Sequence, residues 1–347
     1  MKVQLGKLVN VKTGKLDANA SSINGEYPFF TCSKEPLKIS TYSYDCECVL
    51  VAGNGDLNVK YYNGKFDAYQ RTYIIEDNGC KKIYIPYLYY FMDKYVEKLR
   101  TQSIGGVIKY IKLANITDVE IVLPNFDMQR KIVDKLDKVN AVINKKKRQL
   151  ENLDLLVRSL FIEMFGDIIN TSKYPTVNLG SLGEMLSGGT PSSEHSEYFG
   201  GNIPFISTPC LGENYISYKN AQNFLTDEGV KNSTTNLIPA YSLMIGSRVG
   251  VGKCSINMCE MCTNQDILSF INIDKTKYDL LFIKNVIEQH FDFYESQKRG
   301  ATIKGISSKI VKETKVPKAP LLLQKKFANF VRGTDKSKYS SFSYLSA

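Results

Sequence analysis

The sequence predicts an α+β protein made of two tandem globular modules, related by a pseudo-twofold internal duplication and separated by a long coiled-coil helix. Three observations predict this fold class: the length of 347 residues, a heptad pattern over residues 129–167, and short sequence matches on both sides of that pattern. A chain of this length exceeds the size of one ordinary domain, so two domains are expected.

The central stretch carries apolar residues at alternating spacings of four and three, which is the pattern of a coiled-coil seam. Asn125 or Asp127 is suited to cap the start of this helix, and Gly166 to close its end in a left-handed conformation. At about 1.5 Å per residue the helix is about 58 Å long. Such a seam needs a partner helix, although an ordinary core helix of a bundle is the alternative. The seam residues are Ile132, Leu136, Val139, Ile143, Leu150, Leu153, Val157, Leu160 and Met164.

Four short segments recur in the same order on the two sides of this helix, at a period of roughly 175–195 residues, which indicates a duplicated domain. The matching pairs are VQLGKLVNVKTGK (3–15) with VNLGSLGEMLSGG (177–189), YPFFT (27–31) with IPFIS (203–207), IKYI (108–111) with IKGI (303–306), and QRKI (129–132) with QKKF (324–327). We therefore expect a first module at 1–123, the central helix at 124–167, a second module at 168–319 and a short second helical region at 320–347. Within the modules we expect short strands joined by turns, and helices at 86–99 and 278–296.

Composition limits the function classes. The net charge of +10 and the pI near 9.0 favour a polyanionic partner, although many basic proteins bind none. No apolar run is long enough to span a membrane and the N-terminus has no apolar signal core, so we expect a cytoplasmic protein without a membrane partner. The eight cysteines are few and irregularly spaced, which is typical of reduced thiols.

Motifs for catalysis are weak. Cys259 and Cys262 form a CxxC without a second pair at zinc-finger spacing, so buried thiols are the better interpretation. The glycines of VAGNGD (51–56) and SRVGVGK (247–253) do not fit a phosphate-binding loop, and tight turns between strands explain them. We therefore expect no catalytic residue, no metal site and no cofactor in this chain.

Polar residues suited to DNA are more plentiful. Arginine or lysine pairs with guanine, asparagine or glutamine pairs with adenine, and lysines also contact the phosphate backbone. Ordinary solvated loop positions are the alternative for about half of the candidates. The candidates are Asn54, Lys60, Tyr62, Lys65, Gln70, Arg71 and Lys109 in the first module, and Arg248, Lys253, Asn264, Gln265, Lys298, Arg299, Thr302 and Lys304 in the second.

Five segments together span almost the whole chain and carry a family resemblance. They are PNFDMQRKIVDKLDKV (124–139), SLFIEMFGD (159–167), GTPSSEHSEYFGGNIPFIS (189–207), TNQD (263–266) and PLLLQKKFANFV (320–331). In these segments the sequence resembles the DNA specificity subunit of a type I restriction-modification system.

The resemblance implies two target-recognition domains that each read one half of a bipartite site on double-stranded DNA. It implies that the conserved helices pack as an antiparallel coiled coil and dock methylation subunits, which carry the S-adenosylmethionine chemistry on adenine N6. It also implies translocating nuclease subunits as further partners, and a specificity chain that is not itself catalytic.

One departure from the family pattern affects the interpretation. The second conserved region usually continues as a long helix, whereas here we expect it to end at Gly333, before a tail at 338–347 without a heptad. The distal half of the central helix would then lack a partner within this chain. A shortened scaffold or regulatory paralogue that joins methylation subunits without reading DNA therefore stays open. A separate alternative is an enzyme with its own activity, which would need a cofactor or metal site that the motifs do not provide.

Overall fold

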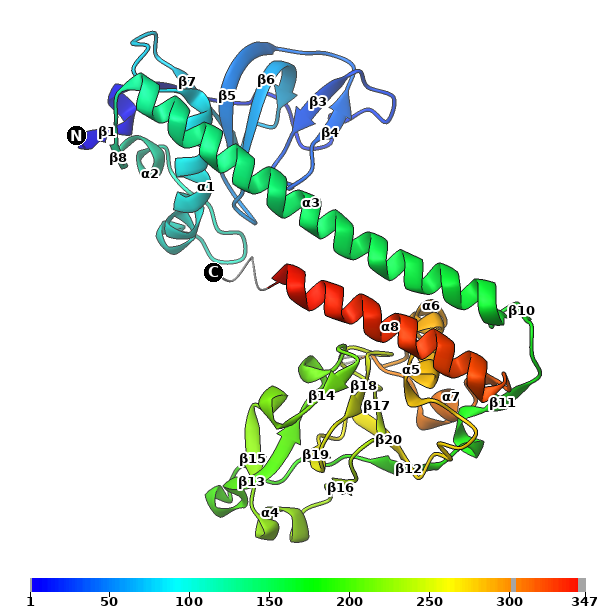
Figure 1. Ribbon diagram of the computed structural model, residues 1–347. Helices are drawn as coiled ribbons and strands as arrows, with labels where there is room; N and C mark the ends of the chain where they lie inside the picture. Colours follow the sequence, from blue (N-terminus) through cyan, green and yellow to red (C-terminus); the bar gives the residue numbers. More distant parts are fainter. Residues whose placement is uncertain (1, 301–303, 343–347) are drawn as a thin grey trace. The chain divides into compact units, whose positions relative to one another are not determined.

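The computed structural model describes residues 2–300 and 304–342, with side chains up to Asp335 (Figure 1). The chain divides into two compact units, Met1–Lys145 and Lys146–Ala347. The division falls inside α3 (Phe126–Phe165), a helix of 40 residues that continues from the first unit into the second. Mixed helices and sheets on both sides of one long helix confirm the predicted fold class.

The first unit is built on a six-stranded sheet with the strand order β2-β7-β5-β6-β3-β4. Its central strand β5 is apolar on both faces: Val49 and Val51 pack with helix α1, while Cys48 and Leu50 belong to a second core on the opposite face. The elements are β1 (Lys2–Gln4), β2 (Val9–Thr13), β3 (Tyr27–Phe30), β4 (Leu37–Ile39), β5 (Tyr44–Ala52), β6 (Val59–Ala68), β7 (Thr72–Asp77), α1 (Ile85–Gln102), α2 (Ala114–Thr117) and β8 (Glu120–Val122).

The second unit has a five-stranded sheet, β12-β20-β17-β18-β14, and a four-stranded sheet, β15-β13-β19-β16. Its largest core lies between the five-stranded sheet and α5, which is buried over seven consecutive residues. The elements are β9 (Gly166–Asp167), β10 (Thr171–Ser172), β11 (Thr176–Asn178), β12 (Glu184–Ser187), β13 (Phe199–Ile206), β14 (Tyr215–Ile216), β15 (Asn223–Leu225), α4 (Asp227–Lys231), β16 (Leu237–Ile238), β17 (Leu243–Gly246), β18 (Cys254–Asn257), β19 (Met261–Thr263), β20 (Ile267–Ile271), α5 (Leu280–Gln289), α6 (Phe291–Gln297), α7 (Ser308–Lys312), β21 (Lys315–Pro317) and α8 (Leu321–Phe342). Short 3-10 helices are η1 (Leu5–Lys7), η2 (Leu179–Ser181), η3 (Ser196–Tyr198), η4 (Thr208–Cys210) and η5 (Tyr218–Asn220).

The duplication extends to individual hydrogen bonds. The first unit pairs its first strand with its last, β1 with β8, and the second unit pairs β11, which follows the short strands β9 and β10, with its last strand β21. Leu5 N–H donates to the Val119 carbonyl at 2.7 Å, and Leu179 N–H donates to the Thr314 carbonyl at 2.8 Å. The sequence matches therefore mark two copies of one backbone framework.

The ends of α3 follow the predicted capping. Asn125 Oδ1 accepts from Met128 N–H at 2.9 Å, so Asn125 is the capping residue. Gly166 has a φ of +86°, which confirms the left-handed conformation expected at the helix end.

The seam residues of α3 differ between the two units. In the second unit Val157, Leu160 and Met164 pack against the core, beside the fully buried Phe161 and Phe165. Leu150 and Leu153 are half-buried there, and in the first unit Ile132 and Ile143 are half-buried, whereas Leu136 and Val139 are exposed.

Helix α8 corrects the expectation about the C-terminal region. It continues through Gly333 to Phe342, so the predicted end at Gly333 is wrong. A glycine inside a helix costs about 1 kcal/mol, but Val331 and Thr334 on either side of it are buried, and their packing outweighs that cost.

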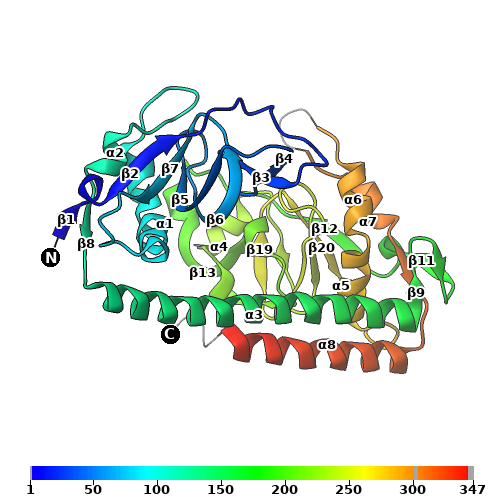
Figure 2. The ribbon, with the colours of Figure 1, turned by 90° about the horizontal axis from the view of Figure 1, so that it is seen from above.

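The predicted lack of a partner for the distal half of the central helix is also wrong. Figures 1 and 2 show α8 antiparallel beside the second half of α3. The Phe327 ring lies 5.4 Å from the Phe161 ring and 5.6 Å from the Phe165 ring, centroid to centroid. The chain therefore supplies a partner helix for that half.

A buried histidine is expected to make the stability of the second unit depend on pH. His290 is 4% exposed between α5 and α6, and its Nδ1–H donates to the Val286 carbonyl at 2.9 Å. Burial lowers the pKa of His290, whereas the unfolded chain binds the proton near pH 6.5. The stability from this residue is therefore complete above about pH 6.5 and is lost as the pH falls below it.

The unfolding free energy of the second unit should fall between pH 7.5 and pH 5, and we expect it to fall less in His290→Gln than in the wild type. Urea denaturation at the two pH values measures both. The matched control is His195→Gln, because His195 lies on the surface. An unchanged pH dependence in the His290 variant would show that this residue does not cause it.

Candidate nucleic-acid interface

Three segments of the first unit meet at the carboxyl end of β5. Gly53 N–H donates to the Arg71 carbonyl at 2.7 Å, and Ile111 N–H donates to the Gly53 carbonyl at 2.9 Å. These bonds join the loop after β5, the β6–β7 turn and the segment before Ile111, which we call the first junction. It brings together the predicted residues Asn54, Arg71 and Lys109.

The side chains at the first junction differ in their freedom. Asn54 Oδ1 accepts from the Cys32 thiol at 2.8 Å. Lys60 is hydrogen-bonded to Asn58, and burial lowers the pKa of Lys60. Arg71 is exposed, and within residues 2–300 and 304–342 its guanidinium makes no hydrogen bond or ion pair. Arg71 and the exposed Lys109 are thus the two cations at this junction that are placed to meet a ligand.

Two candidates of the first unit lie away from this junction. Tyr62 packs against core aromatic rings, and Lys65 Nζ lies 4.6 Å from the centre of the Tyr42 ring, toward the other end of β5 and β6. Gln70 is exposed in the β6–β7 turn, where it donates to Asp17 Oδ1 at 3.1 Å. The structure thus separates Tyr62 and Lys65 from the others and keeps Gln70 next to Arg71.

The second unit repeats the arrangement at the end of β17. Ser247 N–H donates to the Asp266 carbonyl at 2.8 Å, and Ile306 N–H donates to the Ser247 carbonyl at 2.8 Å. The third segment is closed by a reciprocal pair of 2.9 Å hydrogen bonds between Arg299 and Gly305. At this second junction the structure brings together the predicted residues Arg248, Gln265, Arg299 and Lys304.

The second junction combines positive charge with two acidic side chains. Arg248 Nη1 lies 3.5 Å from Asp266 Oδ1, and the Arg248 side chain is 55% exposed while that of Asp266 is 13% exposed. A hollow of about 580 Å³ opens beside this pair, and its lining includes Arg299 and Lys309 as well as Arg248. Glu313 lies in the same lining and forms an ion pair with Lys309 at 3.9 Å, so the hollow keeps a net positive charge that suits a nucleic acid.

The other candidates of the second unit have mixed positions. Lys253 is exposed beside a different hollow, and Lys298 forms an ion pair with Glu295. Asn264 is half-buried in the turn that also carries Gln265. Thr302 lies outside the residues that the structure describes. Whether any of these candidates binds DNA stays a prediction.

A glycine in each unit explains why these turns hold their position. A Cβ at Gly14 would lie 2.1 Å from the Ala68 carbonyl oxygen, and one at Gly188 would lie 2.1 Å from the Asn264 carbonyl oxygen. Only glycine allows this close approach of backbone to backbone. The glycine that the sequence repeats share thus packs against the turns that carry Gln70 and Gln265.

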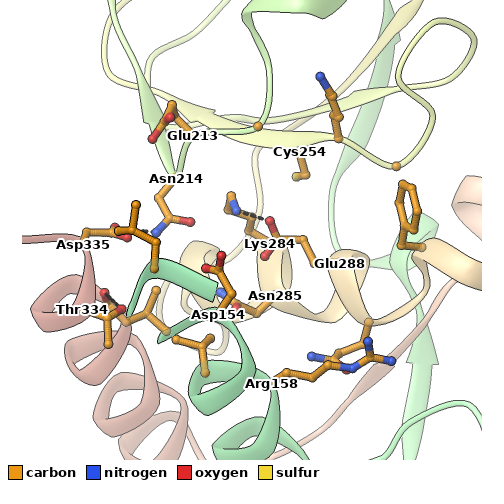
Figure 3. Close-up of a pocket in the computed structure, with 18 residues that line it drawn as sticks. Asp154, Arg158, Glu213, Asn214, Cys254, Lys284, Asn285, Glu288, Thr334 and Asp335 are labelled. Atoms are coloured by element: carbon orange, nitrogen blue, oxygen red, sulfur yellow. Dashed lines mark hydrogen bonds and ion pairs between the residues drawn. The ribbon is translucent and has the colours of Figure 1, made fainter. Parts of the chain in front are cut away.

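Sequence reasoning missed a second hollow, of about 770 Å³, which lies within the second unit beside α3, α5 and α8 (Figure 3). Lys284 is 2% exposed and forms an ion pair with Glu288, and Asn214 Nδ2 donates to Asp335 Oδ2 at 2.5 Å. Figure 3 shows the Asp154 side chain from α3 directed toward this hollow. A lysine inside the apolar run of residues 280–287 was the available signal. These polar groups already have partners, so the hollow does not identify a ligand.

Cysteine, metal and membrane features can be assessed for the described residues. All eight cysteines are free thiols, and burial raises the pKa of Cys262 to about 11. Within residues 2–300 and 304–342 no group of three or more His, Cys, Asp or Glu side chains could hold a metal ion. In the same part of the chain no helix is both long and apolar enough to cross a membrane.

Comparisons with known proteins all point to type I restriction specificity subunits. The family model described as "Type I restriction modification DNA specificity domain" matches residues 1–152 and 171–338. The EcoDI type I restriction enzyme specificity subunit of Escherichia coli is 40% identical over 156 residues, which cover 45% of this chain and 34% of that protein. The MjaIX specificity subunit of Methanocaldococcus jannaschii is 26% identical over 137 residues, 39% of this chain and 32% of that protein. The chain thus spans about a third of the length of these relatives.

Solved structures share the fold. The crystal structure of the type I restriction-modification system S subunit from M. genitalium superimposes with a TM-score of 0.62 at 16% identity, over 100% of this chain and 92% of that one. A structure described as showing complex assembly and conformational transition of the type I R-M system has a TM-score of 0.53 at 15% identity, over 98% of this chain and 91% of that one.

Proposed function

The chain belongs to the family of type I restriction modification DNA specificity domains, and from this premise we propose that it is the DNA-reading subunit of such a system, with each module reading one half of a bipartite site. One observation carries the proposal. Both matched regions contain the same junction of three backbone segments, and both junctions present exposed cationic and amide side chains. These are the side chains that recognise base edges and phosphates.

The central helix is proposed as the spacer and as a docking surface. With 40 residues, α3 has a length of about 60 Å. In the first unit its apolar residues Leu136, Val139 and Val142 are 36%, 54% and 58% exposed. Contiguous exposed apolar side chains are typical of a protein contact, and we assign this one to a methylation subunit.

The chemistry of the complex then belongs to its partners. Methylation subunits would carry S-adenosylmethionine and modify adenine N6, and translocating nuclease subunits would cleave, while this cytoplasmic chain acts without a catalytic site of its own. The alternative, a scaffold that does not read DNA, rests on a second conserved helix that is shorter than the family pattern. Helix α8 is not broken at Gly333, although with 22 residues it is shorter than α3 with 40.

Selection from a random duplex library tests this function. We expect the chain with its methylation subunits to retain duplexes with two short fixed blocks separated by a constant gap, with binding that weakens steeply as salt rises. The methylation subunits without this chain are the control. Recovery of duplexes without any preferred sequence would contradict the proposal.

A further inference from the structure

The two junctions share their backbone hydrogen bonds but place their arginine on different segments. In the first unit the backbone bonds are Gly53 N to Arg71 O, Ile111 N to Gly53 O, Tyr69 N to Phe30 O, and the reciprocal pair between Ile104 and Tyr110. Their equivalents in the second unit are, in the same order, Ser247 N to Asp266 O, Ile306 N to Ser247 O, Asn264 N to Ile206 O, and the reciprocal pair between Arg299 and Gly305. These four matches make the two frameworks equivalent residue by residue.

The equivalence fixes which side chains correspond. Asn54 in the loop after β5 corresponds to Arg248 in the loop after β17. Arg71 in the turn after β6 corresponds to Asp266 in the turn after β19. The two positions together therefore supply one arginine in each unit, from the turn in the first unit and from the loop in the second.

Asp266 is held in place by its backbone. Its carbonyl accepts from Ser247 N–H at 2.8 Å and from Ser247 Oγ–H at 3.0 Å. Its Oδ1 is buried, has no hydrogen-bond partner among the described residues and lies 3.5 Å from Arg248 Nη1. The fixed Asp266 carboxylate orients the half-exposed Arg248 guanidinium through one of its nitrogens. The other N–H groups of that guanidinium stay free to donate to a ligand.

We propose that each unit reads one guanine with the arginine that stands at one of these two corresponding positions, Arg71 in the first unit and Arg248 in the second, and that Asp266 is a positioning residue for Arg248. The inference rests on the proposed DNA-reading function. A guanidinium donates two parallel hydrogen bonds to guanine O6 and N7, which no other base offers. Because the two arginines come from different segments, the guanine lies at a different place within each half-site.

Lysines on the third segment provide a contrast. Lys109 and Lys304 correspond in the two frameworks, and both are exposed. A lysine that contacts a phosphate supports every sequence equally. We therefore assign phosphate contacts to Lys109 and Lys304 and base discrimination to the arginines.

The test measures methylation rates of the assembled complex on its target and on duplexes that carry each single base-pair change. Arg71→Ala should reduce discrimination about 10- to 100-fold at one G·C pair of one half-site, and Arg248→Ala should do so at one G·C pair of the other. Asp266→Asn should weaken discrimination at the same pair as Arg248→Ala, and Asp266→Glu should restore part of it. Lys109→Ala and Lys304→Ala, the matched controls, should slow all duplexes evenly.

Arg248→Lys separates misfolding from lost recognition, because it keeps the charge and loses the bidentate geometry. We expect this variant to retain overall DNA affinity and to lose discrimination at that same pair. If Arg71→Ala and Arg248→Ala both kept full discrimination and an unchanged bipartite target, the inference would be overturned and the proposed function would stand. An effect of Asp266→Asn at a different pair would overturn its positioning role. A wild-type complex that ignores sequence would overturn the proposed function and the inference with it.

Discussion

Phe165→Ala is expected to lower the unfolding free energy of the second unit by about 3–5 kcal/mol. The Phe165 side chain is fully buried at the end of α3, and its ring centre lies 4.7 Å from that of Phe282, 5.0 Å from that of Phe161 and 5.6 Å from that of Phe327. Its removal leaves a cavity between α3, α5 and α8 that these rings cannot close. Urea denaturation followed by circular dichroism measures the loss.

The control for this variant lies on the same helix. Leu155 is 60% exposed, so Leu155→Ala should change the unfolding free energy by no more than about 0.5 kcal/mol. Similar small losses for both variants would mean that the end of α3 does not belong to the core of the second unit.

Gln324→Leu is expected to destabilise the second unit by about 3 kcal/mol, because it leaves buried backbone groups unpaired. Gln324 is fully buried. Its Oε1 accepts from Asp279 N–H at 2.9 Å, and its Nε2 donates to the carbonyls of Lys277 and Ala319 at 3.0 and 2.7 Å. These bonds attach the start of α8 to the segment before α5, and leucine replaces none of them.

The first unit repeats this attachment at the start of α3. Gln129 is fully buried, its Oε1 accepts from Tyr84 N–H at 2.8 Å, and its Nε2 donates to the carbonyls of Lys82 and Pro124 at 2.8 and 2.9 Å. Gln129→Leu should therefore cost a similar amount, but in the first unit.

Hydrogen exchange assigns each loss to a unit, which a single denaturation curve does not. We expect faster exchange of core amides only in the unit that carries the leucine. The matched control is Gln149→Leu, since Gln149 is exposed on α3. Faster exchange in both units for either variant would contradict two separate attachments.

The sequence predicted the elements that depend on local pattern. The expected helix at 86–99 is α1 at Ile85–Gln102. Its apolar residues recur at helical spacing, and the same residues form the buried face of the helix. The one expected at 278–296 is divided into α5 and α6 at His290, whose side chain turns inward. At Gly333 local propensity was misleading, because packing of the neighbouring residues decides the outcome.

The candidate site was predictable only in part. The glycine-containing turns predicted that loops would carry Asn54 and Arg248. The structure places these residues, together with Arg71, at the two junctions. Tyr62 and Lys65 lie on a strand, and sequence distance could not show which end of the sheet they occupy. The positioning role of Asp266 depends on one distance to Arg248, which no sequence pattern contains.

The central claim is that this chain makes a methylation complex read a bipartite DNA sequence. Genome-wide mapping of methylated adenines, in cells with and without the chain, tests it most directly. We predict one motif with two specified blocks and a fixed gap, which disappears when the chain is deleted and returns when it is supplied again. A methylation map that stays the same without the chain would contradict the claim.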